Sequence, residues 1–225
     1  MATVNLNKAP KVNLTKGQTV NLTKDGTENT SKLTKVFFGA KWGQIVHQSK
    51  GGFLGRLFGG STTESVDLDA SLLIYNENGS LIDTVYFGHN RSNDGAIFHS
   101  GDDLDGTAGS EQENDNETIS IDLTKVTSKA KFIVAILNSY RHHKFDQIPY
   151  MKLRIYTGRA GNPDEVLCAY NLENDSSFNG KEAVVLGYFY RCEGGWKFRA
   201  DGTTSTETSI SAIAKGSAKR AIQNH

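Results

Sequence analysis

The residues best suited to chemistry are the carboxylates between Asp94 and Asp122, a stretch that contains nine acidic residues and no Lys or Arg. Its glycines, which tolerate positive φ and so permit tight turns, are Gly95, Gly101, Gly106 and Gly109. Carboxylates gathered in a folded loop repel one another and raise their own pKa values unless their charge is compensated. The stretch therefore predicts either a solvated, disordered insert or an acidic cation site.

A second acidic pair, Asp67 and Asp69, lies upstream in the segment SVDLDAS. At a spacing of two residues both side chains lie on the same side of a strand. Apolar residues follow at once, which indicates that the pair sits where a loop passes into a strand. If this point lies near the loop at 101–117, several carboxylates converge; otherwise the pair is a local cap and turn.

Calcium is the cation that best suits such a cluster, because it takes six to eight oxygen ligands. Magnesium usually keeps several waters, and transition metals favour nitrogen or sulfur, of which only His99 is close in sequence. An EF-hand register that starts at Asp103 places Ala108 and Asn114 where the motif needs Gly and Glu. The sequence therefore predicts a calcium site that is not an EF-hand.

The composition limits the partners and the compartment. The 225 residues include 25 basic and 25 acidic ones, so no net field favours nucleic acid. The amino terminus lacks an apolar signal core, and no run reaches the roughly 18 apolar residues of a membrane span. Two cysteines, Cys168 and Cys192, form no metal-binding spacing. We expect a soluble, cytoplasmic protein with free thiols.

Short segments rich in β-branched and aromatic residues recur along the chain and are separated by turn residues. Examples are LTKVFFGAKW, SLLIYNENG, AKFIVAILN, MKLRIYTG and AVVLGYFYRC. Asn78-Gly79 and Glu193-Gly194-Gly195 are strong hairpin turns. This pattern predicts an all-β protein, a β-sandwich of two mainly antiparallel sheets with long acidic loops and little helix.

The two ends of the chain differ from its centre. VNLNK or VNLTK recurs with a period of eight at Val4, Val12 and Val20, which predicts an N-terminal β-hairpin segment over 1–30. It would pack on a main domain over 31–205. A weak helical pattern at Ile210–Ala221 predicts a C-terminal tail over 206–225 that is helical.

The segment SKGGFLGRLFGG, at 49–60, interrupts the strand pattern. It is not a phosphate-binding loop, since no Lys follows its second glycine pair. The segment is either an insertion folded back onto the sandwich or an exposed apolar tab for a partner or a membrane surface. The residues of this tab are Phe53, Leu54, Leu57 and Phe58.

Several motifs resemble the TerD-type tellurium-resistance family, its TerZ branch in particular. They include LTKVFFGAKWG, KGGFLGRLFGG, SVDLDASLLIY, VYFGHNRSNDGAIFHSGDDLDG, NETISIDL and VVLGYFYRCEGGWKFRADG, from about Val20 to Gly202. The resemblance implies a calcium-binding β-sandwich linked to tellurite and general stress resistance, with two calcium ions expected. The ligands that it implies are Asp67, Asp69, Asp102, Asp103, Gly106, Asp115, Glu117 and Asp175.

These ligand motifs are not identical to those of the family. Asp103 stands where Asn is usual, whereas Asn116 and Asn171 stand where Asp is common. An amide oxygen still coordinates calcium, but each exchange changes the charge of the site and hence its affinity.

Three classes of function remain open. The first is a non-enzymatic calcium-dependent interaction or scaffold module, whose partners are other proteins of the same resistance system. The second is a docking module at the inner membrane face or on a partner through the 51–60 tab, with structural calcium only. The third is a carboxylate-based hydrolase, which the polar, glycine-rich surroundings of the acids disfavour.

Overall fold

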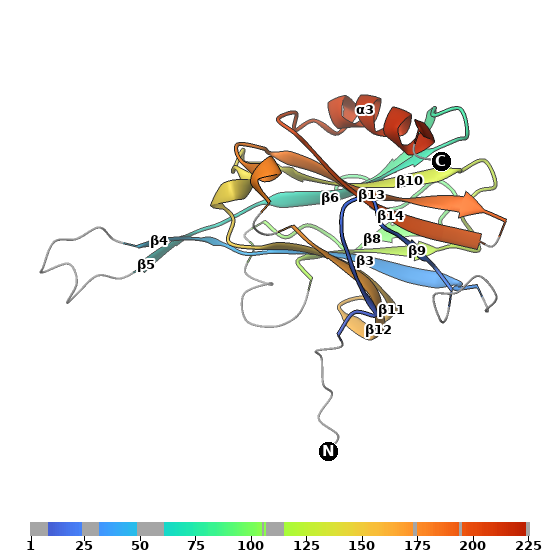
Figure 1. Cartoon of the computed structure of the whole chain (residues 1–225), viewed down its shortest axis with the longest axis horizontal. Coiled ribbons are helices and arrows are strands. Elements are labelled where there is room, and N and C mark those ends of the chain that lie inside the picture. The colour runs from blue at the N-terminus through green and yellow to red at the C-terminus, as the bar shows by residue number, and fades with distance from the viewer. Residues whose placement is uncertain are drawn as a thin grey trace, which may run out of the picture.

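The computed structural model describes residues 9–23, 32–48, 61–104, 106, 115–172, 175–193 and 195–223. Two six-stranded sheets pack face to face (Figure 1). The first has the order β1 (Val12–Leu14), β12 (Asn162–Asn171), β11 (Met151–Arg159), β3 (Lys35–Trp42), β9 (Glu117–Asp122), β8 (Ile97–His99). The second has the order β2 (Thr19–Asn21), β14 (Gly195–Ser205), β13 (Ala183–Cys192), β10 (Phe132–Ser139), β6 (Leu68–Tyr75), β7 (Leu81–Val85). All pairs within them are antiparallel except β1 with β12, so the predicted β-sandwich is confirmed.

The central strands β6 and β10 are buried at every residue. Their inward side chains, such as Leu72 and Ile133, belong to the core between the sheets. Their outward side chains pack under helix α3 (Ile210–Gln223), which lies across this sheet in Figure 1. Tyr75 donates a hydrogen bond from its hydroxyl to the Ala214 carbonyl over 3.0 Å. The predicted C-terminal helix is therefore present, and it covers the second sheet.

The predicted N-terminal hairpin is wrong in its pairing. β1 lies parallel to β12 in the first sheet, whereas β2 lies antiparallel to β14 in the second. The turn between them, with Gly17 at φ +84°, carries the chain from one sheet to the other. An alternating pattern specifies a strand but not its neighbour, and two sheet edges offered unpaired backbone groups. The copy of the repeat at Val4 lies outside the described residues.

Local turn chemistry agrees with the sequence. Gly79 takes φ +76° between β6 and β7, and the Asn76 side chain accepts the N–H groups of Asn78 and Ser80. Short 3₁₀ turns form at η1 (Phe145–Gln147) and η2 (Ser176–Phe178). Cys168 and Cys192 are free thiols. Among the described helices, none combines the length and apolar character needed to cross a bilayer.

Strands β4 (Ile45–Gln48) and β5 (Ser61–Glu64) form a separate antiparallel ribbon that projects from the sandwich in Figure 1. The predicted partner-binding residues Phe53, Leu54, Leu57 and Phe58 lie outside the described residues. The role of this tab stays a prediction.

Candidate metal centre

The start of β6 is held in place by Trp42, the last residue of β3. Its indole Nε1 donates to the Val66 carbonyl over 2.9 Å, and its backbone N–H donates to the Asn116 side chain over 2.9 Å. Both segments that carry the predicted acids are thereby tied to one fully buried residue. Asp67 precedes β6 and Asp69 lies in it, as the sequence predicts.

Three carboxylates meet at this point, those of Asp67, Asp69 and Asp102. Each offers an oxygen atom within 4.8 Å of the other two. Asp67 and Asp69 are 2% and 4% exposed, whereas Asp102 lies at the surface. Arg141 places its Nε 3.3 Å from Asp67 Oδ2. Two segments far apart in sequence therefore build one acidic group.

Glu117 and His99 lie behind this group, at the edge of β6. β7 pairs with β6 only from Leu72 onward, so the Ala70 backbone groups need other partners. Glu117 Oε2 accepts the Ala70 N–H over 2.7 Å. His99 Nε2 lies 3.2 Å from the Ala70 carbonyl oxygen and 3.3 Å from Glu117 Oε2. Side chains of the first sheet thus satisfy an open edge of the second.

The hydrogen bonds of His99 leave the charge of Glu117 uncompensated. The Gly101 N–H donates to His99 Nδ1 over 3.1 Å, so Nδ1 is an acceptor and the ring donates through Nε2 as a neutral imidazole. Glu117 is 1% exposed, and its Oε1 has no hydrogen-bond partner among the described residues. A buried, unpartnered carboxylate oxygen is costly unless a cation or a proton reaches it.

The pKa values of the acids also favour a cation at this group. Burial, followed by the charges of Glu117, Asp67 and Asp102, raises the pKa of Asp69 to about 7. Burial and the charge of Asp102 also raise the pKa of Asp67, although Arg141 opposes the change. Burial raises the pKa of Glu117 too, against the hydrogen bond with His99. A dication would offset the repulsion and the burial that raise the pKa values of these acids.

Asp103 and Gly106 shape the acidic loop. Asp103 Oδ1 accepts the Gly106 N–H over 2.9 Å, and its Oδ2 accepts the Asn116 side-chain amide over 3.0 Å. Gly106 takes φ +74°, and a Cβ there would lie 3.2 Å from Trp42 Nε1. Asp103 lies near enough to Asp67 for its charge to raise the pKa of that residue. These two predicted ligands hold the loop against the sandwich.

Two predicted ligands lie apart from the group of three. Asp115 packs over Gly39 and accepts a hydrogen bond from Arg154 Nε over 2.7 Å. Asp175 caps η2 by accepting the Ser177 N–H over 2.8 Å. Both carboxylates thus have protein partners of their own. Arg154, as the counter-ion of Asp115, carried no recognisable signal in the sequence.

His99 is a site residue that the sequence alone presents only as a nitrogen donor close to the acidic stretch. It is fully buried and alternates with the buried Ile97 across the exposed Phe98. That spacing of two was the available signal, but a strand of three residues is too short for the pattern to be decisive.

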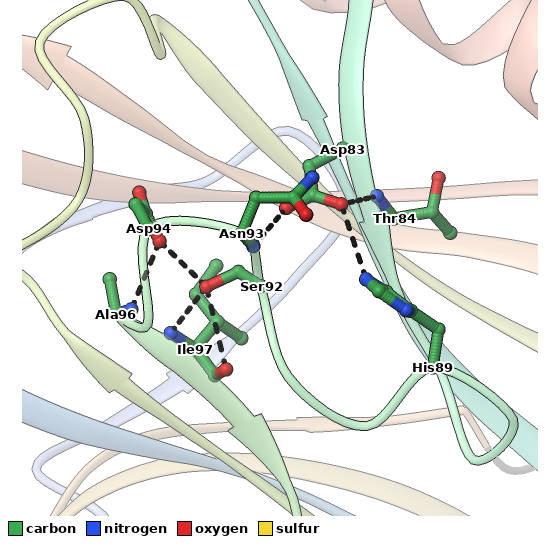
Figure 2. Close-up of polar contacts among 8 residues, drawn as sticks. All are labelled: Asp83, Thr84, His89, Ser92, Asn93, Asp94, Ala96 and Ile97. Atoms are coloured by element: carbon green, nitrogen blue, oxygen red, sulfur yellow. Dashed lines mark hydrogen bonds and ion pairs between the residues drawn. The ribbon is translucent and has the colours of Figure 1, made fainter.

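Other acids nearby are already saturated with donors, as Figure 2 shows. Asp94 Oδ1 accepts the Ser92 hydroxyl and the Ala96 N–H, and Oδ2 accepts the Thr127 N–H. Asp83 accepts the N–H groups of Thr84 and Asn93. These carboxylates fold the loop that leads into β8, and they have no need of a cation.

The group of three suits a hard divalent cation. All its donors are oxygen atoms. Asn138 lies beside it, because its Nδ2 donates to Asp69 over 3.3 Å, and its buried Oδ1 has no hydrogen-bond partner among the described residues. Calcium prefers such donors and tolerates an irregular arrangement. The residues present therefore fit a calcium ion.

The sequence is similar to proteins of one known domain family. The TerD domain matches residues 11–216. Tellurium resistance protein TerZ of Serratia marcescens is 33% identical over 175 residues, which are 77% of this chain and 81% of the relative. Stress response protein SCP2 of Bacillus subtilis is 32% identical over 188 residues, 80% and 88% of the two chains.

A solved structure shows the same architecture. It is a homologue of telluride resistance protein (TerD) from Streptomyces coelicolor A3(2), with a TM-score of 0.60 and 17% identity. The match covers 83% of this chain and 98% of that one, and at this identity it bears on the fold alone. On the domain match and the two relatives, the chain belongs to the TerD domain family.

Proposed function

We propose that this TerD-family protein binds calcium through Asp67, Asp69 and Asp102 and acts without catalysis, as a calcium-dependent interaction module in tellurite and stress resistance. One observation carries the proposal. Three carboxylates from two separate segments lie within 4.8 Å of one another. Behind them is a buried Glu117 oxygen that has no hydrogen-bond partner within the described part of the chain.

The donor set favours calcium over other cations. Three carboxylates, the Asn138 amide oxygen and water supply the oxygen ligands that calcium takes, whereas magnesium keeps more of its waters. His99 is turned toward the Ala70 carbonyl and so offers no free nitrogen for a softer metal. The described residues contain one such group, so we propose one ion here.

Calcium would act by joining two parts of the molecule. Asp67 and Asp69 belong to the buried start of β6, whereas Asp102 belongs to the surface loop that follows β8. An ion shared among them holds the loop against the second sheet and changes the charge of the surface there. A partner protein of the same resistance system would bind this ordered loop. The names of the relatives describe resistance and stress proteins and support this role.

Calorimetric titration of calcium into chelator-treated protein tests the proposal. We expect one saturable heat and a rise in melting temperature with free calcium, because a ligand that binds only the folded state stabilises it. Asp69→Asn should abolish both effects. Glu77→Gln, which alters an exposed acid in the β6–β7 turn, is the matched control and should retain them. An absence of heat and of stabilisation in the wild-type protein would sink the proposal.

A further inference from the structure

The outer face of the first sheet carries a cavity that the calcium site does not use. The outer face of the second sheet is covered by α3, whereas the first sheet has a cavity of about 360 Å³ over β3, β8 and β9. Thr118 and Ser120 form part of its floor, on the side of β9 opposite the inward-facing Glu117. The two sites are therefore on different faces of the sheet.

The register of the strands builds an aromatic slot. Phe98, Ser120 and Phe37 are direct neighbours on β8, β9 and β3. Strands lie about 4.8 Å apart, so the two Phe residues rise from backbones roughly 10 Å apart with a small side chain between them. Aromatic atoms pack at about 3.5–4 Å, so a slot of this width accepts one flat ring. Phe37 is stacked on Tyr156 with the ring centroids 5.4 Å apart, which makes it a fixed wall.

The rim of the cavity is positively charged. Lys35 and Arg159 line it, and no carboxylate does. The Lys35 ammonium lies 5.1 Å from the centroid of the Phe37 ring, and neither Lys35 nor Arg159 makes an ion pair within the described part of the chain. Ser100 accepts the Thr118 N–H through its hydroxyl oxygen, which leaves the hydroxyl hydrogen free to donate. Two cations and the Ser100 hydroxyl favour an anion at this rim.

The turn between β11 and β12 fixes the position of Arg159. Gly158 takes φ +123° and Gly161 takes φ +69°, so the hairpin curls at its tip. The Gly161 N–H donates to the Tyr156 hydroxyl over 2.9 Å, and this bond anchors the turn on the outer face of the sheet. The rim is therefore set by backbone geometry and does not rest on a freely moving loop.

We propose that this cavity binds a small anion with a flat aromatic ring, of the size of a mononucleotide. The ring lies between Phe37 and Phe98 above Ser120, and the phosphate or carboxylate of the ligand meets Lys35 and Arg159. A volume of about 360 Å³ falls within the range of small-molecule sites. Neither calcium nor the acidic cluster takes part.

Titration of the full chain with AMP, followed by amide NMR shifts, tests the site. We expect saturable shifts at Ser100, Ser120 and Gly158 with a Kd below about 1 mM. Adenosine lacks the anion and ribose 5-phosphate lacks the ring, so each should bind at least about fivefold more weakly, since ring stacking and charge contribute separately. The double variant Lys35→Gln/Arg159→Gln should weaken AMP binding at least about tenfold.

Variants of the aromatic wall separate the slot from general charge attraction. Phe98→Ala should weaken AMP binding about fivefold through lost stacking. The matched control is Phe87→Ala, another exposed Phe outside the cavity, and it should bind as the wild type does. The site is overturned if AMP gives no saturable shifts below about 5 mM, or if the double variant binds AMP normally. If ribose 5-phosphate binds as tightly as AMP, the ring slot is overturned.

Discussion

Two groups of acids from the same part of the chain, between Asp67 and Asp102, behave in opposite ways. Asp94 and Asp83 receive N–H and O–H donors from the loop that they fold (Figure 2). Asp67, Asp69 and Asp102 face one another instead, and Glu117 lies behind them with one oxygen unpartnered. The supply of donors, rather than the density of acids, separates a structural carboxylate from a candidate cation ligand.

The pKa values express the same difference. Burial works to raise the pKa of Asp94, yet the hydrogen bonds from Ser92, Thr127 and Ala96 hold it below its usual value. For Asp69, burial and three neighbouring carboxylates act together and raise the pKa to about 7. One acid is stabilised as an anion by the protein alone, and the other holds a proton until a cation arrives.

Among substitutions outside the three proposed ligands, Glu117→Gln should have the largest effect on calcium binding. The substitution keeps the shape and removes the buried charge, so we expect a loss of calcium affinity of about thirtyfold, roughly 2 kcal/mol. The calcium-free protein should melt at a higher temperature, because an uncompensated charge is lost. Calorimetry and thermal melting measure the two effects. An unchanged affinity would mean that Glu117 has no part in the site.

Asp94→Ala should affect the other group alone. It leaves the N–H groups of Ala96 and Thr127 without their acceptor, which costs about 1–2 kcal/mol of unfolding free energy for partly exposed groups. Calcium affinity should stay at the wild-type value, since this carboxylate accepts its hydrogen bonds from Ser92, Ala96 and Thr127 and is not part of the group of three. Urea denaturation and calorimetry on the same sample test both parts; a loss of calcium affinity would erase the distinction between the two groups.

A pH series should separate the two groups without mutation. Asp69 has a pKa raised to about 7. Its contribution to the stability of the calcium-free protein is therefore lost as the pH rises from the ordinary pKa of an aspartate toward 7. Asp94 has a lowered pKa. Its contribution to folding stability is therefore present at pH values above the ordinary pKa of an aspartate and is lost as the pH falls through the lowered pKa.

Calcium affinity should depend on pH through the protonation of Asp69. Below pH 7 it should rise about tenfold per pH unit, because one proton leaves for each ion bound. Above pH 7 it should level off. Titration at several pH values in two buffers of different ionisation heat counts the released protons, and a flat profile between pH 5 and 7 would contradict the raised pKa.

Arg141→Gln should give the smallest change. Arg141 is 49% exposed and lies beside Asp67, so it competes with a cation for that carboxylate only weakly in water. We expect calcium affinity to rise about twofold to fivefold, with little change in stability. Lys125→Gln, which alters an exposed cation paired with Asp122, is the control. A fall in affinity would show that Arg141 positions Asp67 instead of competing for it.

Much of this protein follows from local chemistry and was therefore readable in the sequence. Alternation and turn residues predict the sandwich and the β6–β7 hairpin, because each depends on neighbours within a few residues. The Asp67–Asp69 pair lies at the start of a strand, as its spacing predicts. Its oxygen-only donors predict calcium, and that identity stays a prediction.

What only the tertiary structure decided is which groups meet. β1 and β2 join different sheets because pairing depends on which edges are open elsewhere in the fold. Asp102 reaches Asp67 and Asp69, whereas Asp115 is taken by Arg154 and Asp175 by the Ser177 N–H. His99 and Glu117 become neighbours through the pairing of β8 with β9, and they reach Ala70 because β7 pairs with β6 only from Leu72 onward. Long-range register sets these contacts, and local sequence carries little information about it.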